Sequence, residues 1–401
     1  MSKSDLIIVG GGLIGLATAY QYLQKHPDDK VVLLEKEADV CQHQSGRNSG
    51  VLHSGIYYTP GTHKAGMSLE GKRMMESFLE EEGIPYELCG KVIVAKNESE
   101  LPALGRIFEN GQANAVECEL IGQQKLKELE PHVNGIQAIH VPQSGIADYP
   151  AVAQRLAERI NEQGSQVLTR TRVTGIEENA SEVVVQTDKG SYSANFVVSC
   201  AGLHSDRVAK MTAAEQVSAQ IVPFRGEYFQ LKPRAQHLCK GLIYPVPDPR
   251  FPFLGVHFTK MIEGGVDCGP NAVFAFAREG YKFTDFNGAD FWESISYSGF
   301  QKLAFKYWKF GLEEIWRSLN KAAFVRALQG LIPEITADDL EPHPAGVRAQ
   351  ALRKSGDLVY DFEFVNSKRV LHVVNAPSPA ATVSLNIGRH VVQKLGNELM
   401  A

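Results

Sequence analysis

The 401-residue sequence lacks most features that would place it in a specialised class of protein. No apolar run approaches the roughly 20 residues that a membrane-spanning helix needs, and there is no internal repeat or low-complexity tract. There is no concentrated basic stripe, and the formal net charge is −5, so we expect no nucleic-acid partner. The first residues lead almost directly into an apolar run, so we also expect no signal peptide or transit segment.

Cysteine is sparse as well: six residues are scattered along the chain without a C-x-x-C pair. This spacing argues against a disulfide framework and against a zinc site, so we expect no bound metal and a cytoplasmic chain with reduced thiols. The remaining composition, with 44% hydrophobic and 22% charged residues, is that of an ordinary globular protein. The length allows two or three domains with cores of their own.

The first thirty-five residues hold the clearest motif. A short apolar run at 6–9 leads into Gly10, Gly12 and Gly15, which have G-x-G-x-x-G spacing, and helix-forming residues follow. In this pattern the first glycine allows a tight turn, the second lets a pyrophosphate approach the backbone, and the third lets helix and strand pack closely. A second apolar run ends in Glu35, whose carboxylate would accept hydrogen bonds from ribose hydroxyls. The unit predicts a dinucleotide-binding βαβ fold.

The loop that follows, residues 45–58, mixes small residues with hydrogen-bond donors, aromatic rings, Arg47 and His53. Loops that hold ligands on a rigid scaffold often have this composition. An irregular loop capped by its own serine and asparagine side chains would look the same. Residue types alone do not decide between these two interpretations.

Helical and strand patterns alternate further along the chain. Residues 62–82 predict a helix, and Asp148 can cap another, whereas 166–199 is rich in short β runs. One buried run ends in Ala201 and Gly202, where the backbone can pass close to a ligand. Such a strand end, beside a dinucleotide site, is a second candidate for cofactor contact.

Two later segments carry further signals. Residues 290–329 predict a helical segment that is unusually rich in aromatic residues interspersed with lysine. A helical hairpin packed on its own domain is the favoured interpretation, and a surface that contacts a membrane or an electron acceptor through 291–316 is the alternative. Nearer the C-terminus, Ser378 is a natural N-cap with Pro379 at the first helical position, so a final helix is predicted from there. The start of that helix could stabilise negative charge on a ligand.

Together these motifs resemble the FAD-dependent oxidoreductases of the D-amino-acid oxidase superfamily. Within that superfamily, several stretches resemble the L-2-hydroxyglutarate oxidases and dehydrogenases. These stretches are the loop at 45–58, Pro223–Tyr228, the pair Tyr244–Pro247 and Gly255–Thr259, and Asn375–Thr382. The likeness covers essentially the whole chain.

The resemblance implies an α/β fold with two domains. The first is a Rossmann-like FAD-binding domain of the glutathione-reductase-like, D-amino-acid oxidase type, and the second is an α+β substrate domain with a mixed or antiparallel sheet. Changes in composition near 89, 146, 216 and 340 agree with this division. The FAD-binding domain is then expected in three pieces, 1–88, 146–215 and 340–401, and the substrate domain in two, 89–145 and 216–339.

The family implies FAD as the cofactor. The residues expected from its binding motifs lie in the glycine-rich turn, at the end of the second strand, in the loop at 45–58, at Val173, at the end of the buried run before Ala201 and in one C-terminal stretch. The expected FAD-binding residues are Gly10, Gly12, Leu13, Ile14, Gly15, Glu35, Lys36, Ser45, Arg47, Asn48, Ser49, Val173, Ala201, Gly202, Ala381, Thr382 and Val383.

The resemblance also implies a reaction: oxidation of L-2-hydroxyglutarate to 2-oxoglutarate by hydride transfer to N5 of the flavin, with the electrons passed to oxygen or to a membrane quinone. A base must take the hydroxyl proton, and histidine suits that task near neutral pH. His53, in the loop expected to line the flavin, and His257, on a strand expected to face it, are both candidates. His53 is also a candidate for covalent attachment of the flavin.

A dicarboxylate substrate needs cationic or hydrogen-bonding partners, and arginine can bind a carboxylate with two hydrogen bonds. Arg348 resembles the arginine that amino-acid oxidases of this superfamily place over the flavin, so we expect it to bind the carboxylate next to the reacting carbon and count it with the catalytic residues. Arg225, Tyr228 and Tyr57 are further candidates for positioning the substrate. A salt bridge between the domains is an equally good interpretation of Arg225.

Other functions stay open at this point: a glycine- or sarcosine-oxidase-like flavin amine oxidase, a glycerol-3-phosphate-dehydrogenase-like enzyme, and a non-catalytic FAD-binding electron-transfer protein. The family motifs disfavour the first, and the lack of a basic cluster disfavours the second. We therefore expect a small hydroxy dicarboxylate as substrate and oxygen or quinone as acceptor. The chain is expected in the cytoplasm or held peripherally at the inner face of the cell membrane.

Overall fold

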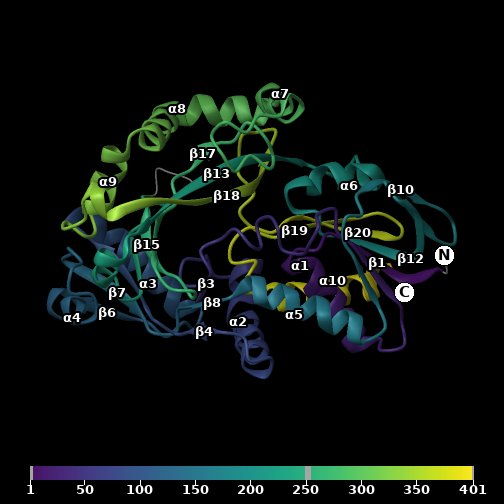
Figure 1. Cartoon of the computed structure of the whole chain (residues 1–401), viewed down its shortest axis with the longest axis horizontal. Coiled ribbons are helices and arrows are strands. Elements are labelled where there is room, and N and C mark those ends of the chain that lie inside the picture. Colours follow the sequence, from purple (N-terminus) through teal and green to yellow (C-terminus); the bar gives the residue numbers. More distant parts are fainter. Residues whose placement is uncertain (1–2, 249–253, 400–401) are drawn as a thin grey trace.

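Two large β-sheets in two adjacent lobes carry the fold of residues 3–248 and 254–399, which the computed structural model describes (Figure 1). In this part of the chain the first sheet has eight strands, and five parallel strands form its centre in the order β20-β12-β1-β2-β9. Their bounds are Val370–Asn375, Gly190–Ser199, Ser4–Val9, Val31–Leu34 and Gln166–Leu168. The remaining strands are β10 (Val173–Glu178), β11 (Val183–Thr187) and β19 (Glu363–Asn366).

Apolar side chains bury this sheet on both faces, as parallel sheets require. From β1, Leu6 and Ile8 point into one core, which they share with α1 (Leu13–Lys25), α5 (Tyr149–Glu162) and α10 (Ser384–Glu398). Ile7 and Val9 point to the other side, where β10, β11 and α6 (Ser205–Ala213) cover the sheet. The predicted Asp148 cap is confirmed, since its carboxylate accepts the N–H of Ala151 at 2.9 Å.

The second sheet has nine strands in the described residues, in the order β17-β13-β16-β15-β14-β5-β7-β6, with β18 on the other side of β13. Their bounds are Val273–Phe274, Ala219–Leu231, Val266–Gly269, His257–Lys260, Leu242–Pro245, Lys91–Ala95, Gln137–Val141, Glu119–Gly122 and, for β18, Leu340–Arg353. β14 and β5 pair in parallel and the other neighbours pair antiparallel. The predicted combination of a Rossmann-like α/β unit with a mixed sheet is therefore confirmed.

The elements that complete the fold are short or lie at the edges of the two sheets. β3 (Val51–Leu52), β8 (Gly145–Ala147) and β4 (Tyr86–Glu87) form a small sheet. The predicted helix at 62–82 is α2 (His63–Glu81), which packs against α10. Helices of the second lobe include α3 (Leu101–Ala113), α4 (Gln123–Leu129) and α9 (Lys321–Gln329). Short 3-10 turns occur at Glu98–Glu100, Gly202–His204, Pro233–Leu238 and Ala337–Asp339.

One boundary differs from the sequence-based division. The sequence places residues from 340 onward with the FAD-binding domain, but β18 pairs with β13 from Leu340 to Arg353 and so belongs to the second sheet. The reason is a long-range pairing that local composition does not encode. β18 then runs back toward the first lobe, where the amide of Ala349 donates to Gln44 Oε1 at 2.9 Å. The other domain limits stay predictions.

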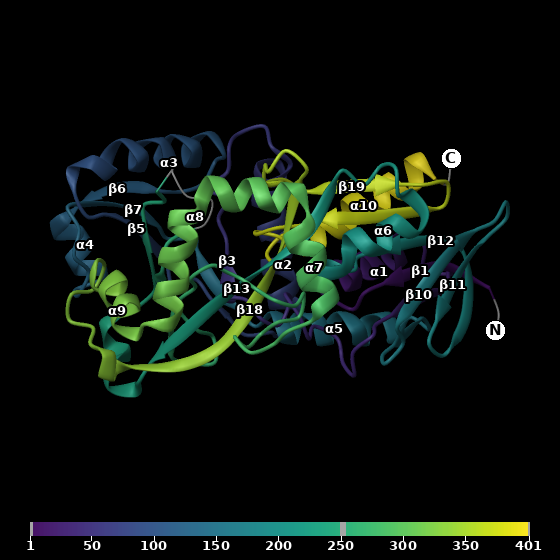
Figure 2. The same cartoon turned by 90° about the horizontal axis from the view of Figure 1, so that it is seen from above.

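Two helix predictions also need correction. The segment at 290–329 divides into α7 (Gly288–Ser296), α8 (Ser298–Leu319) and α9, and α8 is bent at Tyr307 (Figure 2). The last helix begins at Ser384 with Val383 as its N-cap, not at Ser378. Residues 378–383 form successive turns instead, because the side chain of Thr382 is held by the segment around Val51. No helix in the described ranges combines the length and apolar character that crossing a bilayer requires.

Candidate active site

The glycine-rich turn between β1 and α1 has the geometry that a bound dinucleotide needs. Gly10 adopts φ +107°, and a Cβ there would lie 2.5 Å from the carbonyl oxygen that follows β12. A Cβ on Gly15 would lie 2.0 Å from the Gly10 carbonyl oxygen, so only glycine lets α1 pack this closely on the turn. Gly12 is the N-cap of α1, and the Ser45 hydroxyl accepts the N–H of Leu13 at 3.0 Å.

Glu35 ends β2 beside this turn and is buried. Its carboxylate accepts the backbone N–H of Gly11 at 2.7 Å and that of Glu37 at 2.8 Å, which fixes its orientation. An ionised carboxylate offers about four acceptor positions. Two positions therefore stay available for the ribose hydroxyls that the sequence pattern predicts.

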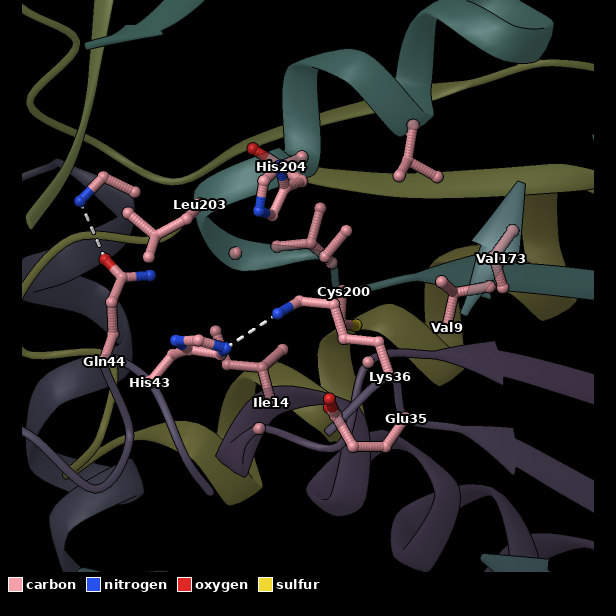
Figure 3. A pocket seen from close by; sticks show the side chains of 18 of the residues that line it. Val9, Ile14, Glu35, Lys36, His43, Gln44, Val173, Cys200, Leu203 and His204 are labelled. Carbon is pink, nitrogen blue, oxygen red and sulfur yellow. Dashed lines mark hydrogen bonds between the residues drawn. The ribbon is translucent and has the colours of Figure 1, made fainter. Parts of the chain in front are cut away.

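A cavity of about 310 Å³ opens beside the turn, between β1, β2, the end of β12 and α6 (Figure 3). Many of the predicted FAD-binding residues line it. They are Gly10, Gly12, Ile14, Glu35, Lys36, Ser45, Val173, Ala201 and Gly202. His43, Gln44, Leu203 and His204 point into the same cavity, although we did not predict them.

The other predicted FAD-binding residues lie outside the lining of this cavity. They are Leu13, Gly15, Arg47, Asn48, Ser49, Ala381, Thr382 and Val383. The Asn48 side chain donates to the backbone of its own loop, to Gln44 at 3.0 Å and Ser45 at 2.6 Å, and Arg47 lies over the ring of Tyr281 at 4.2 Å. The hydrogen bonds of Asn48 fit the loop-capping interpretation, and the roles of Arg47 and Asn48 at FAD stay predictions.

An outer network of charged side chains joins the two lobes at the cavity. It consists of Lys36, Glu37, His43, His204 and Glu279. The ammonium of Lys36 lies 2.6 Å from Glu279 Oε1 and also pairs with Glu37, and His204 Nε2 lies 2.9 Å from Glu279 Oε1. Burial raises the pKa of Glu279, but hydrogen bonds from His204 and Lys36 lower it more, so its net pKa lies well below the ordinary value. Glu37 and Glu279 each lie beside the ammonium of Lys36 and at least one histidine ring.

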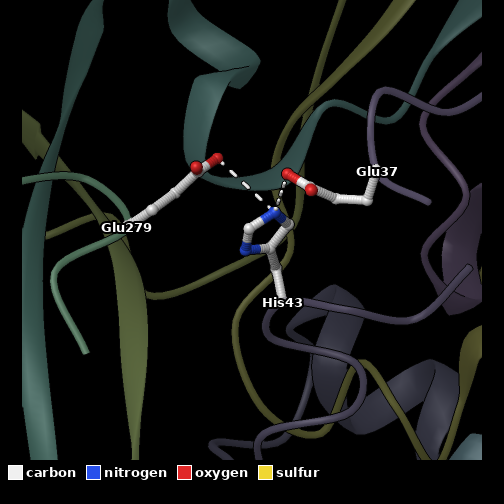
Figure 4. A group of neighbouring side chains, drawn as sticks. All are labelled: Glu37, His43 and Glu279. Atoms are coloured by element: carbon white, nitrogen blue, oxygen red, sulfur yellow. Dashed lines mark hydrogen bonds and ion pairs between the residues drawn. The ribbon is translucent and has the colours of Figure 1, made fainter. Parts of the chain in front are cut away.

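Part of the outer network also has the composition of a metal site. Glu37, His43 and Glu279 offer ligand atoms within 4.8 Å of one another (Figure 4). Lys36 lies among them, since its ammonium contacts both carboxylates and lies 2.9 Å from His43 Nε2. An ammonium group of the chain itself therefore lies among the atoms that would bind a metal ion, and we interpret the group as an ion-pair network.

An inner cluster lies where the second sheet faces the loop at 45–58. It consists of His53, Tyr57, Lys91, Tyr244, His257 and Arg348. The Tyr244 and His257 rings stack with centroids 4.0 Å apart, and Lys91 Nζ lies 4.3 Å from the centre of the Tyr244 ring. Burial lowers the pKa of His53 well below its ordinary value, and nearby Lys91 and His257 lower it further. The structure therefore brings both candidate histidines into one group.

The hydrogen bond of His257 defines its tautomer. Its Nδ1 lies 2.9 Å from the carbonyl oxygen of Gly255, which can only accept, so Nδ1 carries the proton and Nε2 carries a lone pair. Burial, with smaller contributions from the charges of Lys91 and Arg348, lowers the pKa of His257 to about 3, although the hydrogen bond to Gly255 acts in the opposite direction. The ring is therefore neutral near pH 7 and has an acceptor site for a proton.

His53 is held from the C-terminal segment of the first lobe. Its amide donates to Thr382 Oγ1 at 3.1 Å, and its Nε2 lies 3.3 Å from the hydroxyl of Ser378. Thr382 in turn donates to the carbonyl of Val51 at 3.1 Å. The predicted cofactor residue Thr382 thus positions His53, and the serine that we predicted to cap a helix contacts this histidine instead.

Arg348 and Tyr228 come together from neighbouring strands of the second sheet. Burial lowers the pKa of Arg348, and burial raises the pKa of Tyr228 to about 12, with the charge of Arg348 lowering the pKa of the phenol in part. Arg348 Nη1 donates to the carbonyl of Asn271 at 3.3 Å. The carboxylate of Glu314 on α8 lies near enough to raise the pKa of the guanidinium. Arg348 also lies near enough to His257 to lower the pKa of that ring, and we therefore count it with the inner cluster.

Arg225 is differently placed. It is 1% exposed, and its Nε and Nη2 donate to Glu227 Oε1 at 3.0 and 2.8 Å. The partner lies two residues away on β13, so the bridge lies within one strand and does not join the domains. Its charge is already compensated, which favours a structural role over substrate contact.

Sequence reasoning missed Lys91, the outer network and Gln44. Lys91 opens an otherwise apolar strand and looks like the exposed end of that strand in the sequence. Glu279 and His204 lie far apart along the chain and meet only because the lobes pack together. The motif that contains Tyr244 and His257 was the available signal for the inner cluster.

The residues at the cavity fit FAD. Gly12 forms a cradle in which a Cβ would approach Ser45 Oγ to 3.0 Å, and the N-terminus of α1 faces the same space. Backbone N–H groups and the helix dipole at that position favour a pyrophosphate. Glu35 is placed for a ribose, and four members of the outer network line the same cavity, namely Lys36, His43, His204 and Glu279.

Comparison with known proteins agrees with this site. The family model for FAD dependent oxidoreductases matches residues 5–394. An L-2-hydroxyglutarate dehydrogenase of Indibacter alkaliphilus is 49% identical over 97% of this chain and 98% of its own length. Proteins of the same name from Escherichia coli K12 and, as the mitochondrial form, from Mus musculus are 43% and 46% identical over 98% and 96% of this chain and 93% and 87% of their own lengths.

Solved structures show the same fold at lower identity. An FAD-bound L-alpha-glycerophosphate oxidase of Mycoplasma pneumoniae superposes with a TM-score of 0.80 over 99% of this chain and 95% of its own, at 22% identity. A glycine oxidase of Geobacillus kaustophilus gives a TM-score of 0.74 over 100% and 96%, at 17% identity. The cofactor prediction is confirmed by the family match, and the chain belongs to the FAD-dependent oxidoreductases of D-amino-acid oxidase type, in the group of the L-2-hydroxyglutarate dehydrogenases.

Proposed function

We propose that this protein oxidises the CH–OH group of L-2-hydroxyglutarate and yields 2-oxoglutarate. The observation that carries the proposal is the inner cluster, in which Arg348, Lys91 and two neutral histidines converge in a buried region. A site of this kind suits an anionic substrate that must lose a hydroxyl proton. The names of the similar proteins support the same substrate.

In this proposal each residue has a defined task. The guanidinium of Arg348 binds the carboxylate next to the reacting carbon, and Tyr228 beside it donates a hydrogen bond. His257 takes the hydroxyl proton at Nε2, because Gly255 holds its other ring nitrogen in the protonated form. His53 orients the substrate on the opposite side. Bound FAD supplies the acceptor for the hydride that leaves the substrate carbon.

The test is anaerobic mixing of the purified yellow protein with L-2-hydroxyglutarate, D-2-hydroxyglutarate, glycine, sarcosine and glycerol 3-phosphate, with flavin absorbance as the readout. Rapid bleaching by the L-hydroxy acid alone is the expected result. Bleaching by glycine or sarcosine would overturn the proposal in favour of an amine oxidase. Bleaching by none of the five compounds would favour a non-catalytic FAD-binding protein.

We further propose that the chain works in the cytoplasm against the inner face of the membrane and passes its electrons to a quinone there. One face of α8 supports this, because large apolar side chains recur on it at helical spacing and are exposed. They are Trp308, Leu312, Ile315, Trp316 and Leu319. Lys302, Lys306 and Lys309 lie on the same helix, and tryptophan with lysine suits the boundary of an anionic bilayer.

The acceptor can be identified directly. After reduction by substrate, the holoenzyme is mixed either with a water-soluble ubiquinone analogue or with oxygen, and the rate of flavin reoxidation is followed. Faster reoxidation by the quinone, further increased in anionic vesicles, is expected. Fast reoxidation by oxygen with formation of hydrogen peroxide would identify an oxidase instead.

A further inference from the structure

Lys91 is a buried ammonium group without an acidic partner. Its side chain is 1% exposed, and its strand β5 pairs on both sides, with β14 and β7. Within residues 3–248 and 254–399, no carboxylate lies within 4 Å of Lys91 Nζ, and Nζ donates no hydrogen bond. The nearest groups are the rings of Tyr244 and Tyr57, with centroids 4.3 and 5.6 Å from Nζ. Burial therefore lowers the pKa of Lys91 to about 7, and an anionic ligand beside it would stabilise the charged ammonium form.

Other cations of the protein show how unusual this is. Lys72 is buried to a similar degree on α2, and Glu76 one turn away pairs with it. Arg225 pairs with Glu227, and the equally buried Arg278 pairs with Asp206. The chain thus neutralises its buried cations as a rule, and Lys91 departs from that rule at the candidate active site.

A second observation points to a ligand at the same place. The hydroxyl of Tyr57 is buried and has no hydrogen-bond partner in the described part of the chain. Its ring is one of the two that flank Lys91 Nζ. A carboxylate could accept hydrogen bonds from both the ammonium and this hydroxyl, and so would satisfy two groups that are otherwise left unpaired.

The position of His257 relates Lys91 to Arg348. Both cations lie near enough to His257 to lower its pKa, so this ring has two positive groups in its neighbourhood. Arg348 is assigned above to the carboxylate next to the reacting carbon. The substrate carries a second carboxylate at its other end, and Lys91 is the cation of the inner cluster that stays without a partner.

We propose that Lys91, with the hydroxyl of Tyr57, binds the distal carboxylate of the substrate and so makes the enzyme selective for hydroxy acids with two carboxylates. The proposal rests on the proposed function and adds its specificity-determining residue. It assigns the two ends of the substrate to two different cations. It also explains why the protein tolerates an uncompensated lysine in its interior.

The test compares two substrates that differ only at the distal end. L-2-hydroxypentanoate carries a methyl group where L-2-hydroxyglutarate carries the second carboxylate. We expect Lys91→Met to lower kcat/KM for L-2-hydroxyglutarate roughly 100-fold, mainly through KM, because a charge pair is lost. The same variant should change kcat/KM for L-2-hydroxypentanoate less than about threefold, so the preference for the dicarboxylate should disappear. Lys91→Arg should restore part of it.

Binding without turnover gives an independent readout. Glutarate lacks the hydroxyl group and cannot react, so its dissociation constant is measured from the change that it causes in the flavin spectrum. Lys91→Met should weaken glutarate binding roughly 30-fold or more and leave pentanoate binding unchanged. Tyr57→Phe should weaken glutarate binding in the same direction by a smaller factor. Lys72→Met, which removes another buried lysine, is the control and should leave the preference unchanged.

The outcomes separate this proposal from the proposed function. If wild-type protein is not bleached by L-2-hydroxyglutarate, the function fails before Lys91 is tested. If it is bleached and Lys91→Met loses activity equally with both substrates, Lys91 acts at the reacting end or at the cofactor, and the proposal is wrong. An unchanged preference would also overturn it. Should Lys91→Met fold poorly, glutarate binding to Lys91→Gln and Lys91→Arg decides the question.

Discussion

The outer network and the inner cluster are both rich in charge, but they differ in their balance. In the outer network Lys36, His43 and His204 each lie beside Glu37 or Glu279. In the inner cluster Lys91 lies among aromatic rings and neutral imidazoles. A balanced network stabilises the contact between two lobes, whereas an excess of positive charge in a buried region lowers stability until an anion binds. The difference supports our proposal that the substrate is recognised at the inner cluster.

The largest effect should come from Arg348. Arg348→Met removes the partner of the reacting carboxylate, and we expect kcat/KM for L-2-hydroxyglutarate to fall roughly 1,000-fold. Arg348→Lys should restore little of this, because an ammonium cannot form the paired hydrogen bonds of a guanidinium. Steady-state kinetics with an artificial acceptor measures the loss. The kcat/KM for L-2-hydroxypentanoate should fall by a similar factor, because both substrates carry the carboxylate next to the reacting carbon. If Arg348→Met left kcat/KM nearly unchanged for both substrates, the proposed division of tasks between Arg348 and Lys91 would be wrong.

A smaller effect concerns acid stability. Burial lowers the pKa of His257 to about 3, whereas the ordinary pKa in the unfolded chain is 6.5. Between these two pH values His257 is protonated in the unfolded chain and neutral in the folded protein. The free energy of unfolding therefore decreases as the pH falls from about 6.5 to about 3. Between pH 7 and pH 5 this histidine should cost about 2 kcal/mol of the free energy of unfolding.

His257→Gln should remove that part of the slope, and urea titrations of the holoenzyme at the two pH values measure it. The comparison uses the difference between the two pH values, so any constant effect of the substitution on packing cancels. An unchanged slope in the variant would show that the ring is accessible to protons in the folded state. The inner cluster would then be less well shielded from solvent than its burial indicates.

The outer network should make a smaller contribution to stability, and this contribution should depend on the salt concentration. Glu279→Gln leaves Lys36, His43 and His204 without their shared carboxylate and should lower the free energy of unfolding by about 1 kcal/mol at low salt. The loss should shrink at high salt, because the side chains are partly exposed and therefore screened. Thermal unfolding at two ionic strengths measures it. A large fall in kcat/KM under conditions where the variant is fully folded would contradict a purely structural role for this network.

These two regions also show what sequence can predict. The turn at Gly10, Gly15 and Glu35 follows from spacing within one βαβ unit, because Gly15 contacts Gly10 and Glu35 bonds the amide of Gly11 inside that unit. The inner cluster was predictable only in part: His53 and His257 lie in recognisable motifs, but Lys91 does not. Its burial depends on aromatic rings from two other segments, and no local pattern encodes that.

The same distinction between local and long-range contacts explains the errors in the fold. The pairing of β18 with β13 joins residues more than a hundred positions apart, so the domain boundary at 340 could not be derived from composition. The predicted cap at Ser378 was reasonable by residue type, yet this side chain contacts His53 from the other end of the chain. Long-range contacts therefore determine both the position of β18 and the role of Ser378.

The exposed face of α8 should have the smallest effect on the isolated protein. Trp308→Ser combined with Trp316→Ser removes two side chains that are 56% and 59% exposed, so stability should change by less than about 0.5 kcal/mol, and turnover with a soluble dye should stay the same. Binding to vesicles of anionic phospholipid, measured by cosedimentation, should nevertheless fall severalfold. Lys125→Ser, on the distant helix α4, is a control that removes an exposed charge elsewhere. If the tryptophan variant bound vesicles as well as wild type, α8 would not be the membrane-contact surface. If turnover with the dye fell instead, the helix would have to support Arg348, whose neighbour Glu314 lies on the same helix.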